Sequence, residues 1–149
     1  MADAVTAQEM TVTRVLDAPR ELVWKAWTEP DQLARWWGPR GWSNPLETIT
    51  MDVRPGGAFR VISVSDEDGT EMTTQGVFRE VDEPERLVLE ERAENAWHEG
   101  AESVITLSDL GDGRTELVLR STIHTTDEMR VQAEAGLRAS LDRLAEHLR

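Results

Sequence analysis

The C-terminal segment constrains the possible fold more than any other part of the chain. Thr125 and Glu128 have the spacing of a capping box, which predicts that a helix begins here. We expect the helix over about 126–147, because apolar residues recur through this segment at the spacing of one helix face. This apolar stripe consists of Met129, Ala133, Leu137, Leu141, Leu144 and Leu148. A helix with such a stripe must cover a second apolar surface.

Alternation of apolar and polar residues predicts that this second surface is a β-sheet. The sequence indicates strands over 10–17, 46–53, 58–65, 72–81, 86–93, 101–109 and 114–124. Turn signals such as Asp68-Gly69 and Gly111-Asp112-Gly113 separate neighbouring strands. Because short connections of this kind join antiparallel strands, the sheet is expected to be antiparallel.

Two short helices are expected after the first strand. Pro19 suits the first position of a helix, and Pro30 ends that helix and begins another over 31–37. The order of elements predicts an α+β protein with a helix-grip fold. In this fold a curved antiparallel sheet wraps around the long C-terminal helix, which buries both apolar surfaces.

The two-residue period of a strand sorts its side chains onto two faces, and the more apolar face should meet the helix. Apolar residues expected on this inner face include Phe59, Val61, Phe78, Leu89 and Ile105. The same face also carries polar residues, namely Ser63, Thr74, Glu91, Ser103 and Ser121. Because a buried polar group needs a partner or a water, these residues either orient a ligand in a partly wet cavity or lie at strand ends near solvent.

Tryptophan is concentrated in one part of the chain. The sequence has six Trp, two Phe and no Tyr, and five of the six Trp fall between residues 24 and 42. Trp27 is expected in the core, because it lies at helical spacing with other apolar residues. Trp36, Trp37 and Trp42 could belong either to the core or to the wall of an apolar pocket.

Composition argues against several classes of function. The chain has 149 residues, no Cys and a formal net charge of −13, so it has no disulfide or thiolate metal site and would repel nucleic acids and anionic membranes. It has no apolar run of the roughly 20 residues that span a membrane, and its first residues lack the pattern of a secretory signal. We expect a cytoplasmic protein, with residues 1–9 as a flexible leader and residues 10–149 as a single domain.

The sequence contains no metal-ligand spacing, phosphate-binding loop or nucleophile motif. His98 lies next to Glu99 and could form an acid–base pair with it, although a neighbouring Glu is expected by chance in so acidic a chain. We therefore assign no catalytic residue, no metal and no cofactor.

Several motifs together are similar to those of a known family. They are TVTRVLDAP (11–19), VWKAWTEP (23–30), LARWWGP (33–39), VRPGGAF (53–59), GVFREV (76–81) and LDRLAEHL (141–148). From about residue 10 to 149 the chain resembles the AHSA-type proteins, small bacterial relatives of the activator of the heat-shock chaperone ATPase. These belong to the START-like, or Bet-v-1-like (SRPBCC), superfamily.

The resemblance implies a cavity between the sheet and the C-terminal helix that binds apolar small molecules, since the superfamily includes lipid carriers and polyketide cyclases. Members of the family often carry a Gly-Trp pair before the last motif. This chain has Gly136-Leu137 instead, which suggests a roomier or differently shaped pocket.

The leading hypothesis is a non-enzymatic protein that binds a hydrophobic or aromatic small molecule in this cavity. One alternative is an enzyme of the polyketide cyclase or hydrolase kind that uses polar residues such as Glu91 or His98. Another is a module that contacts a chaperone or forms a homodimer. The residues expected to line the cavity are Trp36, Trp37, Trp42, Phe59, Val61, Phe78, Leu89, Glu91, Trp97, Ile105, Met129, Leu137 and Leu141.

Overall fold

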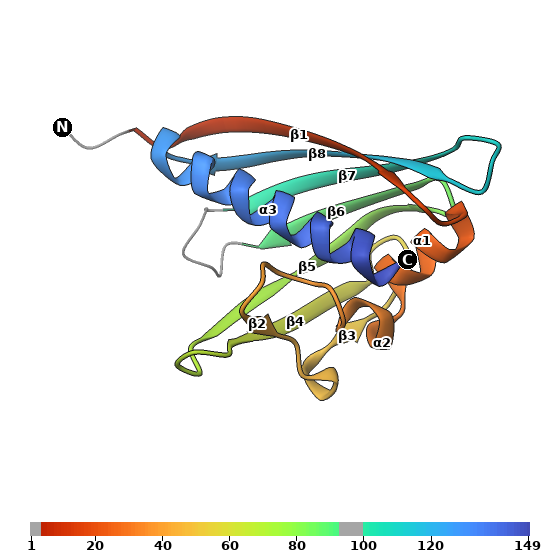
Figure 1. Ribbon diagram of the computed structural model, residues 1–149. Helices are drawn as coiled ribbons and strands as arrows, with labels where there is room; N and C mark the ends of the chain where they lie inside the picture. The colour runs from red at the N-terminus through yellow and green to blue at the C-terminus, as the bar shows by residue number, and fades with distance from the viewer. Residues whose placement is uncertain (1–3, 93–99) are drawn as a thin grey trace.

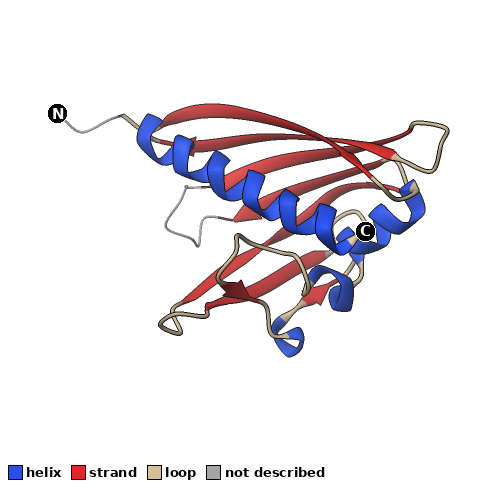
Figure 2. Cartoon of the chain, viewed as in Figure 1, coloured by secondary structure: helices blue, strands red, loops and turns tan. Residues whose placement is uncertain are grey.

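A long helix lies across one face of an antiparallel sheet in the computed structural model, which describes residues 4–92 and 100–149 (Figures 1 and 2). The sheet has eight strands in the order β1-β8-β7-β6-β5-β4-β2, and β3 pairs separately with β4. The strands are β1 (Thr6–Leu16), β2 (Trp42–Ser43), β3 (Thr50–Met51), β4 (Ala58–Ser65), β5 (Glu71–Asp82), β6 (Arg86–Arg92), β7 (Gly100–Asp109) and β8 (Thr115–Thr125). The helices are α1 (Arg20–Thr28), α2 (Pro30–Leu33) and α3 (Asp127–His147), with a 3₁₀ turn, η1 (Leu46–Thr48). This arrangement confirms the helix-grip fold with two short helices after the first strand.

Two expected boundaries in the first 40 residues are wrong. The first strand begins at Thr6 and pairs there with Thr125 of β8, so residues 6–9 belong to the sheet and not to a leader. The second helix ends at Leu33, and the chain then turns, with the Trp36 amide 3.2 Å from the carbonyl oxygen of Leu33. Gly38 follows with a φ of 80°, a conformation that a helix cannot continue through.

The strand expected over 46–53 is largely replaced by η1 and the two-residue strand β3. The hydroxyl of Thr48 donates to the carbonyl oxygen of Pro45 at 2.7 Å, which stabilises a tight turn in place of an extended strand. Periodicity alone does not reveal such a competing local hydrogen bond.

The cap of α3 is Thr126 and not Thr125. The Thr126 side chain accepts a hydrogen bond of 3.2 Å from the amide of Met129, which satisfies one of the free donors of the first turn. Asp127 and Glu128 occupy the same turn, where negative charge is favourable.

Only the C-terminal half of α3 packs tightly on the sheet. Leu141 and Leu144 are fully buried within the main core. Ala133 and Leu137 are half-buried and contact a separate small cluster formed by Met10, Ala101 and Ile123, and Leu137 also packs against the edge of the main core. The N-terminal half of the helix therefore contacts the β1–β7–β8 side of the sheet and stands away from its centre.

The backbones of β5 and β6 approach each other closely at Gly76. Gly76 pairs with Glu91, and a Cβ atom at Gly76 would lie 1.9 Å from the carbonyl oxygen of Glu90. The register then shifts between Phe78 and Glu80, which is a bulge of the kind that bends a strand. Because Gly76 has no side chain, the backbone of β6 at Glu90 and Glu91 can lie directly against β5.

Within residues 4–92 and 100–149, no helix combines the length and the apolar character needed to cross a membrane.

The packing of α3 predicts the effect of shortening Leu144, one of the two leucines that bury this helix against the sheet. Leu144→Ala should lower the free energy of unfolding by about 2–5 kcal/mol, because Leu144 is fully buried and the change leaves a cavity. Leu22→Ala is the matched control, since Leu22 is 50% exposed on α1, and it should cost less than about 1 kcal/mol. Urea denaturation measures both values, and equal losses in the two variants would contradict the packing described for α3.

Candidate functional site

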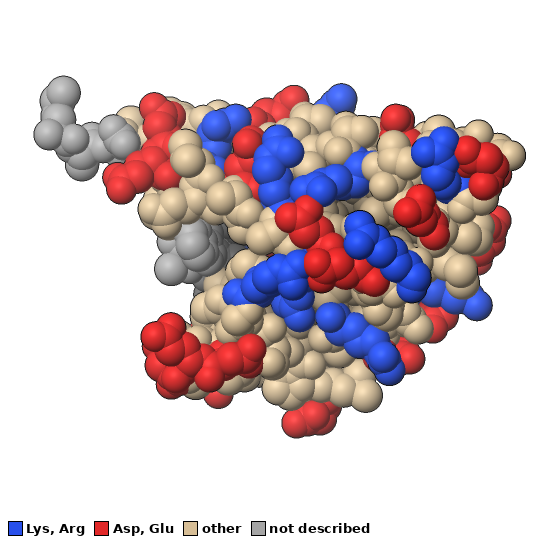
Figure 3. Space-filling model, viewed as in Figure 1, with Lys and Arg blue, Asp and Glu red and all other residues tan. Residues whose placement is uncertain are grey.

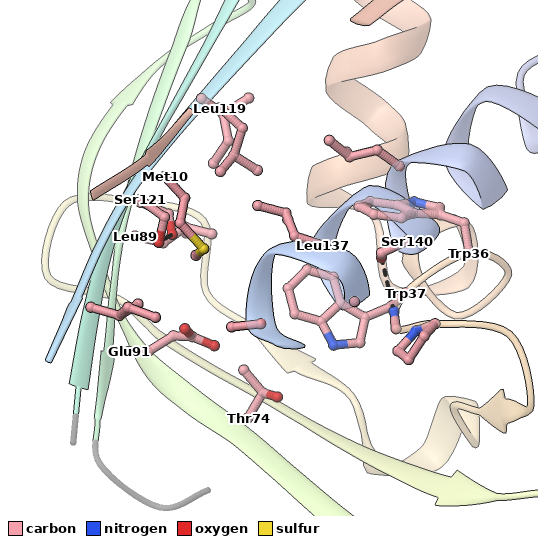
Figure 4. Close-up of a pocket in the computed structure, with 18 of the residues that line it drawn as sticks. Met10, Trp36, Trp37, Thr74, Leu89, Glu91, Leu119, Ser121, Leu137 and Ser140 are labelled. Atoms are coloured by element: carbon pink, nitrogen blue, oxygen red, sulfur yellow. Dashed lines mark hydrogen bonds between the residues drawn. The ribbon is translucent and has the colours of Figure 1, made fainter. Parts of the chain in front are cut away.

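A cavity of about 240 Å³ lies between the sheet and the middle of α3, from Gln132 to Leu141 (Figure 4). The sheet supplies one wall, α3 supplies the opposite wall, and the segment between α2 and β2 closes one end. The sequence-predicted residues that line it are Trp36, Trp37, Trp42, Phe59, Leu89, Glu91, Ile105, Leu137 and Leu141.

The remaining predicted residues do not meet in this cavity. Phe78 is fully buried with its ring 5.5 Å from that of Phe59, and Phe59 is the one that reaches the cavity. Val61 lies with Phe78 beside a separate small void in the core, and Met129 lines neither space. Trp97, and with it His98, falls in 93–99, outside the described residues.

The tryptophan cluster is both core and cavity wall. Trp27 contacts Trp36 and Trp37 edge to face, with ring centroids 4.7 and 6.3 Å apart. The indole nitrogen of Trp36 donates to the carbonyl oxygen of Ala26 at 2.9 Å, which fixes the corner between α1 and α2. All three rings also line the cavity, so the two readings of the cluster are both correct.

A row of polar side chains crosses the sheet wall of the cavity. Thr74 on β5, Glu91 on β6, Ser103 on β7 and Ser121 on β8 all line it. The Ser103 hydroxyl donates to that of Ser121 at 3.1 Å, and Figure 4 shows the Glu91 carboxyl group pointing into the space between the sheet and α3. These four residues, which we call the polar row, match the expectation of polar groups in a cavity.

Ser63 behaves differently from the other polar residues of the inner face. Its hydroxyl donates to the side-chain oxygen of Asn44 at 2.7 Å, and the Asn44 amide nitrogen donates to the carbonyl oxygen of Trp37 at 2.7 Å. Ser63 therefore supports the backbone of the cavity wall from behind.

Several lining residues were missed by sequence reasoning. Met10 reaches the cavity because β1 pairs with β8, where Met10 lies opposite Ser121. Only knowledge that the first and last strands are neighbours could have placed it. The others are Trp27, Gly38, Pro39, Met72, Leu119, Ile123, Gln132, Ala133, Gly136 and Ser140. Leu119 and Ile123 share the alternation of Ser121, which is a signal that could have found them.

The segment that closes one end of the cavity is held by a single guanidinium group. Nη1 of Arg143 on α3 lies 3.1, 2.9, 3.1 and 3.3 Å from the carbonyl oxygens of Trp37, Gly38, Pro39 and Trp42. Because one nitrogen carries two hydrogens, it shares them among these acceptors. We call residues 37–42 the rim segment.

Further contacts join α3 to the rim segment and to the residues just before it, including an ion pair between Arg40 and Glu146. Nη2 of Arg143 reaches the carbonyl oxygen of Arg35 at 3.4 Å, and the Gly38 amide donates to the Ser140 hydroxyl at 3.1 Å. Burial lowers the pKa of Arg143 from its ordinary value, and the positive charge of Arg40 lowers it further. Carbonyl dipoles thus take the place of solvent around this side chain.

The chemistry available in the cavity is recognition by shape and hydrogen bonding. Glu91 is the ionisable residue that lines it within the described parts of the chain. In the same parts, no cluster of His, Asp and Glu is placed to hold a metal ion. The walls are otherwise apolar apart from hydroxyl, amide and indole groups.

A comparison with known protein families shows which family the chain belongs to. The model of the family described as "Activator of Hsp90 ATPase homolog 1-like protein" matches residues 17–149. The chain belongs to this family. The match confirms the resemblance to AHSA-type proteins of the START-like superfamily, and it agrees with both a ligand-binding and a chaperone-contacting role.

Several solved structures share the fold of this family member. A Nitrosomonas europaea protein is 27% identical, with a TM-score of 0.76 over 94% of this chain and 93% of its own. A Chromobacterium violaceum protein is 26% identical, with a TM-score of 0.80 over 94% and 96%. The AHSA1 protein of Silicibacter pomeroyi, at 20% identity, has a TM-score of 0.81 over 95% and 97%, which shows the fold alone. A comparison with the curated proteins finds no match.

The contacts of Arg143 predict that it holds the rim segment in place. Arg143→Ala should lower the free energy of unfolding by about 2 kcal/mol, because it removes a charged donor from several half-buried carbonyl groups. Amide exchange at Gly38 should also become faster as the rim segment loosens. Arg138→Ala, which removes an exposed guanidinium from the same helix, should change neither quantity appreciably. Unchanged exchange at Gly38 in Arg143→Ala would contradict this role.

Proposed function

We propose that the chain binds an apolar or aromatic small molecule in the cavity under α3 and releases it unchanged. The observation that carries this proposal is the cavity of about 240 Å³, whose walls are mostly apolar side chains, of Trp, Leu, Ile, Met and Phe above all. Concave, largely apolar sites with a few polar groups are typical of small-molecule binding.

The size of the cavity limits the size of its occupant. A cavity of roughly 150 Å³ lined by apolar side chains holds benzene, so 240 Å³ suits a molecule with two fused aromatic rings. The edge-to-face Trp36 and Trp37 rings, 5.7 Å apart, offer aromatic surface for such a molecule.

Calorimetric titration with 1-naphthalenemethanol tests the proposal. The parent protein should bind one equivalent, with a dissociation constant below about 1 mM. Leu137→Trp should weaken binding at least about tenfold, because Leu137 lines the cavity and the larger side chain fills it. Leu22→Trp adds the same ring at an exposed position and should bind as the parent does.

Equal affinity in the parent and in Leu137→Trp would place the ligand elsewhere and contradict the proposal. Mass spectrometry of the recovered ligand separates binding from catalysis. A chemically altered product that depends on Glu91 would favour the enzyme of the cyclase or hydrolase kind.

The family description supports a second candidate, a module that contacts a chaperone of the Hsp90 class. The ATPase rate of such a chaperone, measured with and without the chain, tests it. Stimulation by the parent and by Leu137→Trp alike would favour this function over cavity binding, because docking to a protein surface does not need an empty interior.

A further inference from the structure

We propose that Gly136 limits the size of the ligand that the cavity accepts, because its missing side chain lets a fused aromatic ring system lie directly on the backbone of α3. This inference rests on the proposed function and adds a residue that determines its specificity. It starts from the position of Gly136 in the interior of α3, where it lines the cavity.

Glycine in the interior of a helix is unfavourable, so its presence in α3 needs a reason. Relative to Ala, it loses more conformational freedom on folding. The usual structural reasons are a positive φ or the close approach of another backbone. Gly136 is not among the glycines with positive φ, and among residues 4–92 and 100–149 a Cβ atom there would meet nothing within 4 Å beyond its own helix backbone and chain neighbours. Packing of the described residues therefore leaves room for Ala at this position.

The space beside Gly136 belongs to the cavity. Gln132 and Ser140 lie one turn before and one turn after Gly136 on the same side of α3, and all three residues line the cavity. Ser140 is buried and its hydroxyl accepts the hydrogen bond from the Gly38 amide, so the rim segment meets α3 one turn beyond Gly136. Gln132 is exposed, and the outline of the molecule is indented between the β4–β5 hairpin and the N-terminal half of α3 (Figure 3).

Apolar side chains surround this part of the helix. Leu137 follows Gly136, and Figure 4 shows Leu137 and Trp37 on the opposite side of the cavity from Leu89 and Thr74 of the sheet. A flat two-ring molecule between these walls would contact the α3 backbone where no side chain keeps it away. A methyl group at position 136 would take up part of that space, and one methylene in an apolar pocket changes affinity by about 10–200-fold.

Calorimetric titration of Gly136→Ala with 1-naphthalenemethanol tests the proposal. The variant should bind the compound at least about tenfold more weakly than the parent does. Its midpoint of urea denaturation should rise, because Ala is the better helix former. A gain in stability together with a loss of affinity is not expected from a glycine whose role is only structural.

Ala135→Gly is the matched control. Ala135 is the neighbouring residue of α3, but it is exposed and does not line the cavity. This variant should lower the urea midpoint and bind 1-naphthalenemethanol within about twofold of the parent. The double variant Ala135→Gly/Gly136→Ala keeps the composition of the helix, so its midpoint should lie near that of the parent, while its affinity should fall as in Gly136→Ala.

The outcomes separate this inference from the function on which it rests. If Gly136→Ala binds as tightly as the parent, or if Ala135→Gly weakens binding equally, the role of Gly136 is overturned while binding to the cavity stands. If the parent does not bind 1-naphthalenemethanol, the proposed function fails and the inference fails with it.

The parent protein alone gives a second test, which decides the inference even if a variant does not fold. Nuclear Overhauser effects are expected between the naphthalene protons and the α protons of Gly136. A spectrum with contacts to Leu137 but none to Gly136 would overturn the inference.

Discussion

Burial of Leu141 and Leu144 holds α3 against the sheet, and the cavity lies beside this contact, with Leu141 in its wall. Leu137, about one turn earlier, is half-buried and packs against both the main core and the small cluster at the β1–β7–β8 side of the sheet. A helix that packed along its whole length would leave no space between α3 and the sheet. The same amphipathic stripe thus stabilises the domain and contributes Leu137 and Leu141 to the wall of the cavity.

The cavity walls are fixed before any ligand arrives. Arg143 binds the carbonyl groups of the rim segment, Asn44 joins that segment to β4 through Ser63, and Trp36 is held by the backbone of α1. Each contact connects the rim to a different element. A site that needs little ordering on binding loses less conformational entropy, so modest apolar contacts suffice for measurable affinity.

The sequence predicted the sheet, the helices and their arrangement better than it predicted how deeply each side chain is buried between them. Alternation correctly placed both Phe59 and Phe78 on the inner face of the sheet. It carries no information on which of the two rings reaches the cavity and which is covered by its neighbours. Met10 depended on a pairing between the chain's first and last strands, which local pattern does not reveal. The role of Arg143 was invisible for another reason, because its partners are backbone carbonyl groups that every residue carries.

The central claim is that a small aromatic molecule occupies the space under α3. Nuclear Overhauser effects between 1-naphthalenemethanol and the methyl groups of the labelled protein test it most directly. The account predicts contacts with Leu119 on the sheet and Leu137 on the helix at the same time, since both line the cavity. Contacts confined to exposed methyl groups such as those of Leu22 and Val131 would contradict it.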